Sequence, residues 1–343
     1  MAKLSIVILN WNGISFLKTF LPEVVKTADL PGVEVVVADN GSNDGSVNWI
    51  RENLNQVKTI EFDQNYGFTG GYNRALSSIN SDYYLILNSD VKPTDGWLQP
   101  LIAAMDRDIN IAACMPKTLA FHSPEHFEYA GAAGGYIDRF GFPFCRGRIL
   151  SHVEKDSGQY DNTCDIFWAT GACMMVRASA FHSAGGFDEF FFAHMEEIDL
   201  CWRFKNMGHR ILFVPESTVY HVGGGTLPND NPRKLFLNYR NNLILLVKNL
   251  PSGMLLTTLF ARFFMDMGAS LVFLLSGKWR FSMSIIKAYC AFYKKSFHYK
   301  RLRKQLEHSS RNTLHPEIYR GSIVYDFFFK KKKTFTSLNF KED

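Results

Sequence analysis

The first 120 residues alternate between short apolar runs and longer segments whose apolar residues recur every three or four positions. Runs rich in β-branched and aromatic residues, such as LSIVIL (4–9), VEVVVAD (33–39) and YYLILN (83–88), predict buried strands. ISFLKTFLPEVVKTA (14–28) and WLQPLIAAM (97–105) predict amphipathic helices. This alternation predicts an α/β fold with a mostly parallel central sheet and helices on both faces.

The middle of the chain is less regular. Residues 121–165 are rich in glycine and aromatic residues, which predicts a loop or hairpin excursion. The order of strand then helix returns in residues 165–181. Residues 194–208 predict a further helix, and residues 209–225 predict a strand followed by a glycine-rich loop. We take residues 1–245 as one α/β domain.

Residues 246–343 have a different character. The apolar segment 251–277 is interrupted by Thr258, Arg262, Asp266 and Ser270, each four positions after the last, so a narrow polar stripe follows one side of the predicted helix. Two ionisable groups make this a poor spanning helix. From Met267 to Leu306 there is no acidic residue, while nine Lys and Arg residues interleave with aromatic residues, and FFFKKKK (327–333) repeats this pattern.

These features predict a C-terminal amphipathic helical region that lies in the headgroup layer of an anionic membrane. The alternative is a helical subdomain that packs on the sheet, with its lysines in water. Nucleic acid is not expected as a partner, because no recognition motif accompanies the positive charge.

Composition and the N-terminal segment indicate the cellular compartment. The chain has 343 residues, of which 46% are hydrophobic and 21% charged, with a net charge of +5, and this is typical of a globular protein with a large core. Its six cysteines show no C-x-x-C spacing, which argues against a structural zinc site or a disulfide framework. The apolar run after MAK is too short for a signal peptide, so we expect a cytoplasmic protein.

Polar loops follow the predicted strands: NWNG (10–13), DNGSNDGS (39–46), DQNYGFTGG (63–71) and NSDVKPTDG (88–96). The carboxyl ends of parallel strands meet at one edge of a sheet, where ligands bind in open α/β folds. The first loop lacks the G-x-G-x-x-G fingerprint, which favours a mononucleotide over a dinucleotide.

Three positions in these loops are candidates for ligand contacts. Asp39 is placed to contact a nucleoside, although with Ser42 it could instead make only turn hydrogen bonds. The glycines at 67, 70 and 71 would allow close approach of a phosphate or sugar, or simply form a flexible turn. Asp90 could bind a divalent cation on a diphosphate, or cap the helix near Trp97, for which Asp95 is closer.

The later part of the domain carries further candidates. Glu196, Glu197 and Asp199 precede a helix, where they either complement its dipole or hold a catalytic base. His221 ends a strand and is either a metal ligand or a structural histidine.

Together, and in this order, these stretches resemble family 2 glycosyltransferases with the Rossmann-like GT-A fold, in particular the bacterial rhamnosyltransferase-like branch. The resemblance covers about residues 3–245. It rests on NWNG, VADNGSNDGS, NYGFTGGYN, LNSD, TGACM, EEIDLCWR and the late His221.

The resemblance implies a role for each of these positions. Asp39 would contact the nucleoside, Asp90 would bind Mn²⁺ or Mg²⁺, and His221 would be a second metal or diphosphate contact. Glu197 would be the general base, with Glu196 and Asp199 raising its pKa. Arg203 would neutralise the diphosphate and Gly171 would border the donor sugar and acceptor. The other donor-binding positions would be Asn10, Asn12, Asn40, Ser42, Asn65, Gly67, Asn73 and Asn88.

Two positions depart from the family pattern. Asn88 replaces the first acid of the metal-binding element, and Glu197 stands where many relatives have Asp. The implied activity is inverting transfer of a sugar from a dTDP- or UDP-linked donor to a glycan or lipid-linked saccharide, at the inner face of a bacterial plasma membrane, in polysaccharide synthesis.

Three alternatives are weighed against this activity. A sugar nucleotidyltransferase would need a Gly/Arg/Lys-rich loop after the first strand, which NWNG does not supply. An inactive nucleotide- or glycan-binding module of an assembly complex would keep the loops without the reaction. A membrane-tethering scaffold would leave the loops at the strand ends unexplained.

Overall fold

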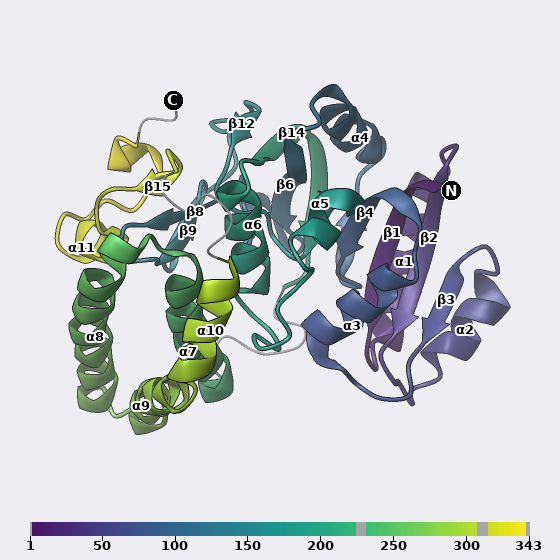
Figure 1. Cartoon of the computed structure of the whole chain (residues 1–343). Coiled ribbons are helices and arrows are strands. Elements are labelled where there is room, and N and C mark those ends of the chain that lie inside the picture. The colour runs from purple at the N-terminus through teal and green to yellow at the C-terminus, as the bar shows by residue number, and fades with distance from the viewer. Residues whose placement is uncertain (1, 224–230, 307–314, 341–343) are drawn as a thin grey trace.

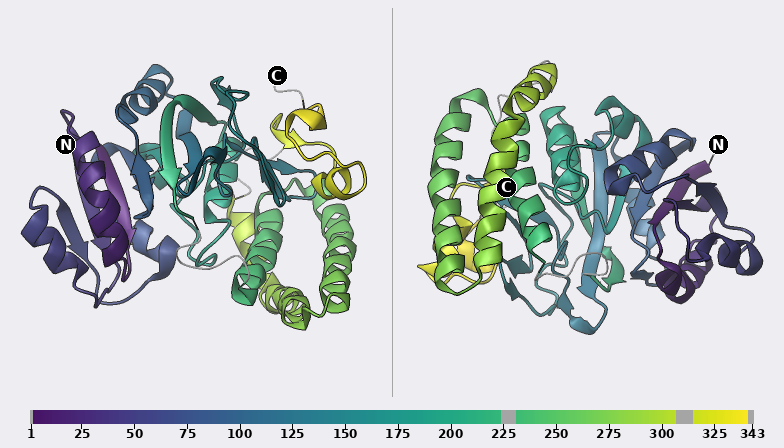
Figure 2. Two further views of the ribbon diagram at one scale, coloured as in Figure 1. Left: turned by 180° about the vertical axis from the view of Figure 1, so that it is seen from behind. Right: turned by 90° about the horizontal axis from the view of Figure 1, so that it is seen from below.

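The computed structural model describes residues 2–223, 231–306 and 315–340. A large sheet of ten strands lies at the centre, and a smaller sheet and a group of long helices lie at one end of it (Figure 1). The N-terminal strands lie at the opposite end, so sequence position roughly follows the length of the molecule (Figures 1 and 2).

The first part of the chain forms the parallel strands that the sequence predicts. β2 and β4 both pair parallel to β1, and β3 pairs parallel to β2. The elements are β1 (Ala2–Asn10), α1 (Ile14–Thr27), β2 (Val33–Asp39), α2 (Ser46–Asn53), β3 (Lys58–Glu61), α3 (Gly67–Ser77) and β4 (Ser81–Leu87).

The second part completes the large sheet, in the order β12-β14-β6-β13-β4-β1-β2-β3. β13 runs antiparallel between β4 and β6, and the short β5 pairs antiparallel with β14. These elements are β5 (Val91–Pro93), α4 (Leu98–Arg107), β6 (Ile111–Ala120), β7 (Ser123–Phe127), β12 (Cys164–Asp165), β13 (Cys173–Arg177), α5 (Ala178–Ser183), α6 (Glu196–Asn206) and β14 (Arg210–His221).

The irregular middle segment contributes a second sheet, in the order β11-β10-β9-β8-β15. The hairpin expected there is present as β8 and β9, and the C-terminal strand β15 pairs parallel with β8. The strands are β8 (Gly135–Asp138), β9 (Pro143–Cys145), β10 (Arg148–Ile149), β11 (His152–Val153) and β15 (Ile318–Tyr319).

The C-terminal region is largely helical, as expected. Its elements are α7 (Pro232–Asn249), α8 (Ser252–Leu275), α9 (Trp279–Lys294), α10 (Ser296–Leu306), α11 (Ile323–Phe328) and a 3₁₀ turn, η1 (Thr336–Leu338). The domain boundary proposed at residue 245 falls inside α7, and β15 returns to the small sheet. The two parts of the chain therefore share a helix and a sheet.

Both faces of the large sheet are covered. Ile6 and Ile8 of β1 pack in the apolar cluster that contains α1 and α4, whereas Val7 packs in the cluster on the other face. This alternation follows from the pleat of the strand, and it explains why β1 reads as an unbroken apolar run.

Helix α8 buries its polar side and exposes its apolar side, which is the reverse of an ordinary surface helix. The polar stripe of Thr258, Arg262, Asp266 and Ser270 is buried, and large apolar side chains on the other side are exposed. Among the described residues, α8 is the one helix long and apolar enough to cross a membrane by length and composition. Figure 1 shows it at the edge of the molecule, with α11 beside one of its ends.

Candidate active site

The ends of β1 and β2 form the first part of the site. Asn10 and Asp39 are register partners, and Asn10 Nδ2 donates to Asp39 Oδ1 at 2.9 Å. Asn10 also donates to Ser42 and Ser46, and Asp39 Oδ2 accepts from the Ser42 N–H. Asp39 thus makes the turn hydrogen bonds that were its structural alternative. A nucleoside contact by Asp39 remains a prediction.

The loop after β3 is tied to the same edge. Asn40 donates to Asn65 Oδ1 and to the Gly67 carbonyl, both at 3.0 Å, and Asn65 Oδ1 accepts from the Gly67 N–H. Gly67 has a φ of +74°, and a Cβ there would lie 2.9 Å from the Phe192 ring. A glycine is therefore required by both backbone and space.

Of two other predicted donor contacts, Asn73 lies outside this cluster of hydrogen bonds, whereas the Asn12 N–H donates to Ser42 Oγ at 2.9 Å. Asn73 donates to the Phe187 carbonyl and accepts from the Phe187 N–H, so it holds the segment after α5 against α3. Asn12 is exposed, has a φ of +51°, and accepts from the Asn43 N–H. Both stabilise the loops, and their contact with a donor remains a prediction.

Asp90 and His221 meet where β5 pairs with β14. His221 is opposite Val91 in this ladder, which brings His221 Nε2 to 3.2 Å from Asp90 Oδ1. Asn88 Nδ2 is 3.5 Å from the same nitrogen. Asp90 therefore faces the histidine. The β5 pairing that produces this contact could not be predicted from the sequence.

Glu128 is a functional candidate that sequence analysis missed. Its Oε1 is 3.5 Å from His221 Nδ1, and both side chains are buried. Burial acts to lower the pKa of His221, but Asp90 and Glu128 together raise it to about 10. Glu128 lies outside every recognisable motif, and only the fold brings it to the histidine.

Glu196 and Glu197 occupy the first turn of α6. Burial raises the pKa of Glu197 to about 7, although backbone N–H groups at the helix start oppose the rise. Burial, with the charge of Glu197, raises the pKa of Glu196 well above its ordinary value. No hydrogen-bond partner within the described chain reaches either Oε2 atom. One of the pair is therefore available to take a proton near neutral pH.

Gly171 connects the acids to the metal-side residues. A Cβ at Gly171 would lie 3.8 Å from Glu197 Cβ and 3.6 Å from the Phe68 ring. The next residue, Ala172, accepts from the Asn88 N–H at 2.9 Å. The TGAC, LNSD and EEID segments, distant in sequence, thus meet at Gly171 and Ala172.

Cys145 lies near both groups of acids. Burial raises the pKa of its thiol, the Arg148 guanidinium opposes this, and the carboxylates of Glu128 and Glu197 add to the rise. Arg148 is buried and donates to Cys145 Sγ at 3.3 Å. A buried cation on β10 thus interacts electrostatically with Glu128, and the sequence pattern did not single it out.

Asp199 and Arg203 are placed differently from their predicted roles. Arg203 Nε donates to Asp199 Oδ2 at 2.9 Å, and Lys248 and Asn249 of α7 bond the same carboxylate at 2.8 and 2.9 Å. Burial acts to raise the pKa of Asp199, but Lys248 and Arg203 hold it below its ordinary value. Both side chains therefore face α7 and the end of α5, and we assign them a structural role in place of base tuning and diphosphate contact.

The segment before α6 has a strained backbone, and a side chain of α7 bonds it. Phe192, His194 and Met195 have φ values of +64°, +70° and +74°. Asn241 Nδ2 donates to the carbonyls of Phe191, Ala193 and His194 at 2.8–3.0 Å. Such conformations persist only where neighbours fix them, so this α7 amide positions the acids that follow.

Asp90 and His221 would fit a divalent cation once the His221 ring has lost the proton that its raised pKa holds on it. The Asp90 carboxylate oxygen suits Mn²⁺ or Mg²⁺, and a nitrogen of the neutral His221 ring would be a second ligand, with diphosphate oxygens and water as the remaining ligands. The described residues contain no cluster of three or more His, Cys, Asp or Glu side chains arranged to hold a metal. Since the first acid of the element is Asn88, the pair supplies fewer protein ligands than a complete set.

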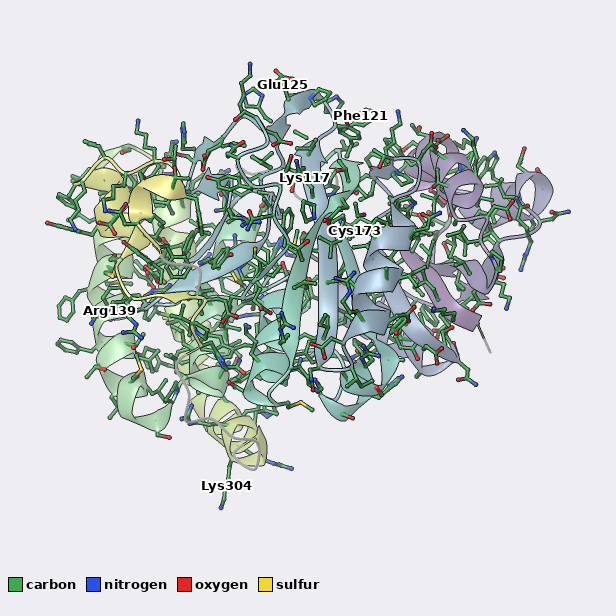
Figure 3. All side chains as sticks on the ribbon, turned by 90° about the horizontal axis from the view of Figure 1, so that it is seen from above. Lys117, Phe121, Glu125, Arg139, Cys173 and Lys304 are labelled. Carbon is green, nitrogen blue, oxygen red and sulfur yellow. The ribbon has the colours of Figure 1, made fainter. Side chains whose placement is uncertain are left out.

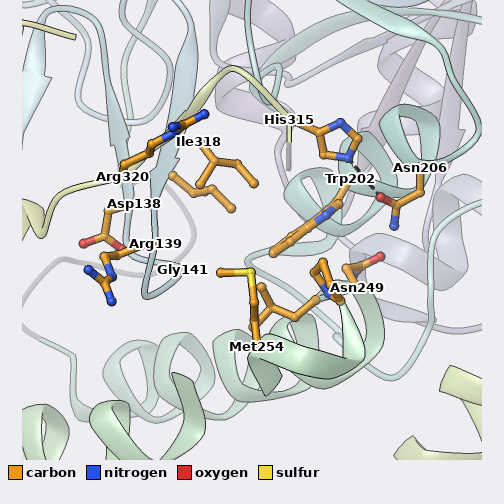
Figure 4. A pocket seen from close by; sticks show the side chains of 13 residues that line it. Asp138, Arg139, Gly141, Trp202, Asn206, Asn249, Met254, His315, Ile318 and Arg320 are labelled. Carbon is orange, nitrogen blue, oxygen red and sulfur yellow. Dashed lines mark hydrogen bonds between the residues drawn. The ribbon is translucent and has the colours of Figure 1, made fainter. Parts of the chain in front are cut away.

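A cavity of about 220 Å³ lies between α6, the α7–α8 junction and the small sheet. Figure 4 shows Trp202, Asn206 and His315 on one side of it and Asp138 and Arg139 on the other. No predicted donor-, metal- or base-site residue lines it. We therefore separate it from the candidate active site.

Comparison with known proteins decides the family. The model described as Glycosyl transferase family 2 matches residues 5–184, just over half of the chain. The chain belongs to glycosyl transferase family 2. The family and enzyme class predicted from the motifs are confirmed, and the sugar nucleotidyltransferase alternative loses its support.

Two relatives of this glycosyltransferase are named as a rhamnosyltransferase and a hexosyltransferase of glycan biosynthesis. It is 25% identical over 261 residues to N-acetylglucosaminyl-diphospho-decaprenol L-rhamnosyltransferase of Mycobacterium tuberculosis, covering 71% of this chain and 83% of that protein. It is also 25% identical to the low-salt glycan biosynthesis hexosyltransferase Agl10 of Haloferax volcanii, covering 70% and 74%.

Solved structures confirm the GT-A fold. The mannosyltransferase PcManGT of Pyrobaculum calidifontis, in complex with GDP-Man and Mn²⁺, superposes with a TM-score of 0.52 at 12% identity, covering 96% of this chain and 88% of that chain. GalNAc-T7 with UDP, GalNAc and Mn²⁺ gives a TM-score of 0.58 at 17% identity, covering 74% and 49%.

The Asp199–Lys248 contact generates a stability prediction. Lys248→Met should lower the free energy of unfolding by about 3 to 5 kcal/mol, because it leaves a buried carboxylate without its main cation. Urea unfolding followed by circular dichroism measures this change. Lys58→Met, which removes an exposed lysine paired with Glu34, is the control and should cost less than about 1 kcal/mol. Equal effects of the two substitutions would contradict the structural role of Asp199.

Proposed function

We propose that the protein is an inverting glycosyltransferase in which Glu197 is the general base and Asp90 and His221 hold the divalent cation. One observation carries the proposal: Gly171 packs against Glu197, its neighbour Ala172 bonds Asn88, and Asn88 lies beside His221, so the partly buried base and the Asp90–His221 pair are connected through adjacent residues. A sugar placed between them would have the base on one side and its diphosphate on the metal side.

The reaction follows from this placement. Glu197 takes the proton of an acceptor hydroxyl as the hydroxyl oxygen attacks the anomeric carbon. The new bond forms on the face opposite the leaving group, the bond from the anomeric carbon to the diphosphate oxygen breaks, and nucleoside diphosphate departs with the bonding electrons. Inversion needs only one base, because the leaving group is stabilised by charge rather than by a proton.

The leaving diphosphate needs positive charge. A bound Mn²⁺ or Mg²⁺ supplies it by polarising the phosphate oxygens. Among this chain's own residues, Asp90 and His221 would hold that ion, and Glu128 would orient the His221 ring through its other nitrogen. Arg148 is a buried cation that interacts electrostatically with Glu128, and we assign it the electrostatic role that the resemblance suggested for Arg203.

We further propose the partners. The donor is a dTDP- or UDP-linked sugar, bound by the Asn10–Asp39–Ser42 and Asn40–Asn65–Gly67 loops, and the named activities of the relatives favour rhamnose. The acceptor is a glycan or lipid-linked saccharide of a cell-surface polysaccharide. The enzyme would then work at the cytoplasmic face of a bacterial membrane with an anionic surface.

The base assignment predicts a pH profile. Since Glu197 must be ionised and burial raises its pKa to about 7, kcat/KM should fall as the pH drops below about 7. Glu197→Gln should lower kcat by about 10²- to 10⁴-fold and leave nucleotide affinity unchanged. Single-turnover transfer assays across pH measure both. If Glu196→Gln rather than Glu197→Gln abolishes transfer, Glu196 is the base.

The metal assignment predicts cation-dependent nucleotide binding. Titration calorimetry with UDP, dTDP and GDP, with and without Mn²⁺, should show that one nucleotide binds better when Mn²⁺ is present. Asp90→Asn should weaken that binding at least about tenfold, since it removes a carboxylate ligand and its charge. Asp95→Asn, an exposed acid in the turn that follows β5, is the matched control and should bind as the unaltered protein does.

Two results would contradict these assignments. Unchanged affinity of Asp90→Asn would remove Asp90 from the metal site. Metal-dependent nucleotide binding without transfer to any acceptor, and with no effect of Glu197→Gln in a reconstituted assembly, would favour the inactive binding module.

A further inference from the structure

The buried side of α8 is polar, and Arg262, Asp266 and Ser270 on it bond neighbouring helices. Arg262 donates to Asn242 of α7 and pairs with Asp266 at 3.2 Å. Asp266 also accepts from the Tyr289 hydroxyl of α9 at 2.8 Å, and Ser270 is 2.8 Å from Ser282 of the same helix. These contacts fix which side of α8 faces α7 and α9, so its apolar side must face outward.

That outward side is large and apolar. Leu256 and Leu275, near the two ends of α8, are both 79% exposed, and Phe260 between them is 69% exposed. α11 lies beside one end of α8 in every view (Figures 1 and 2). We define the apolar face as Leu256, Phe260, Phe263, Phe264, Leu271, Val272, Leu274 and Leu275 of α8, Trp279, Met283 and Ile286 of α9, and Tyr325, Phe328 and Phe329 at α11.

Exposed cations are next in sequence to several residues of the apolar face. Lys278 and Arg280 flank Trp279, Lys287 follows Ile286, and all three are exposed. Lys330 and its lysine neighbours follow Phe329 directly. Arg139 and Lys304 lie at the surface of the same half of the molecule (Figure 3). An apolar surface bordered by lysine and arginine complements a membrane interface with anionic headgroups.

A spanning orientation does not fit this arrangement. α8 has 24 residues, which at 1.5 Å per residue gives a length of roughly 36 Å. Crossing a bilayer would surround α8 with lipid or carry α7 and α9 in with it, since Arg262 and Asp266 are bonded to those helices. Because its exposed apolar residues run from one end to the other, α8 can instead lie flat.

We propose that the apolar face inserts into one leaflet of an anionic membrane, with α8 parallel to its plane. This inference rests on the proposed function in one respect: membrane insertion would bring the active site to a lipid-linked acceptor. It differs from the sequence expectation, in which the basic segment 267–306 lay in the headgroup layer. Here α8 and α11 supply the inserted surface and the basic residues border it.

The test uses the full chain and vesicles. Flotation should show binding to vesicles of phosphatidylcholine mixed with phosphatidylglycerol, with part of the binding retained at high salt because apolar side chains are inserted. Phe260→Asn combined with Leu271→Asn should reduce binding about tenfold or more. Ile109→Asn, an equally exposed apolar residue in the α4–β6 loop, is the matched control and should change nothing.

Insertion depth separates leaflet insertion from adsorption. Brominated lipids should quench the fluorescence of Trp279, and the quenching should disappear in Trp279→Phe. Lack of vesicle binding or absence of quenching would overturn the proposal. A dimer that forms without lipid and dissociates on the Phe260/Leu271 substitutions would also overturn it, because a second copy would then cover the face.

The outcome is independent of the reaction. The Phe260/Leu271 variant should retain nucleotide binding and its normal melting temperature, because both side chains are exposed. Asp90→Asn should retain vesicle binding. The Phe260/Leu271 variant thus tests membrane binding alone, and Asp90→Asn tests nucleotide binding alone. Failure of the membrane proposal can therefore be distinguished from failure of the proposed function.

Discussion

A buried ion pair between Asp199 of α6 and Lys248 of α7 joins the two halves of the molecule. Asp199 has no exposed surface and Lys248 only 3%, so both charges depend on each other and on Arg203 and Asn249. A buried charge that loses its partner is costly, so α6 has few alternative positions relative to α7. The position of Glu197, two residues before Asp199, follows from this constraint.

The acids of α6 show how one short segment can hold carboxylates in opposite states. Asp199 faces cations and stays ionised, whereas Glu196 and Glu197 have no cation partner among the described residues and their pKa values rise. Environments that separate neighbouring pKa values are typical of sites where one group must accept a proton. Sequence spacing alone could not separate them, because the three acids lie within four positions and one helical turn.

The predictable parts of this protein are those that depend on local pattern. Apolar runs and polar loops were sufficient for β1 to β4, for the edge where Asn10 and Asp39 meet, and for the family. Contacts that depend on long-range pairing were not predictable. The approach of His221 to Asp90 follows from the three-residue strand β5, and that of Glu128 follows from its position directly after β7, which pairs with β6 outside every motif. The α8 stripe was visible in the sequence, but its direction depends on partners in α7 and α9.

The same constraint connects the proposed membrane contact to chemistry. α7 ends at Asn249 and α8 begins at Ser252, so only two residues separate the helix that holds α6 from the helix that carries the apolar face. Asn241 of α7 bonds the strained backbone before Glu196, and the next residue of α7, Asn242, bonds α8. Neighbouring residues of one helix thus fix the base on one side and the apolar face on the other. An enzyme whose acceptor is held by lipid needs a fixed angle between its site and the membrane, because a misplaced hydroxyl would lie beyond the reach of Glu197. A rigid helix supplies that angle where a flexible linker could not.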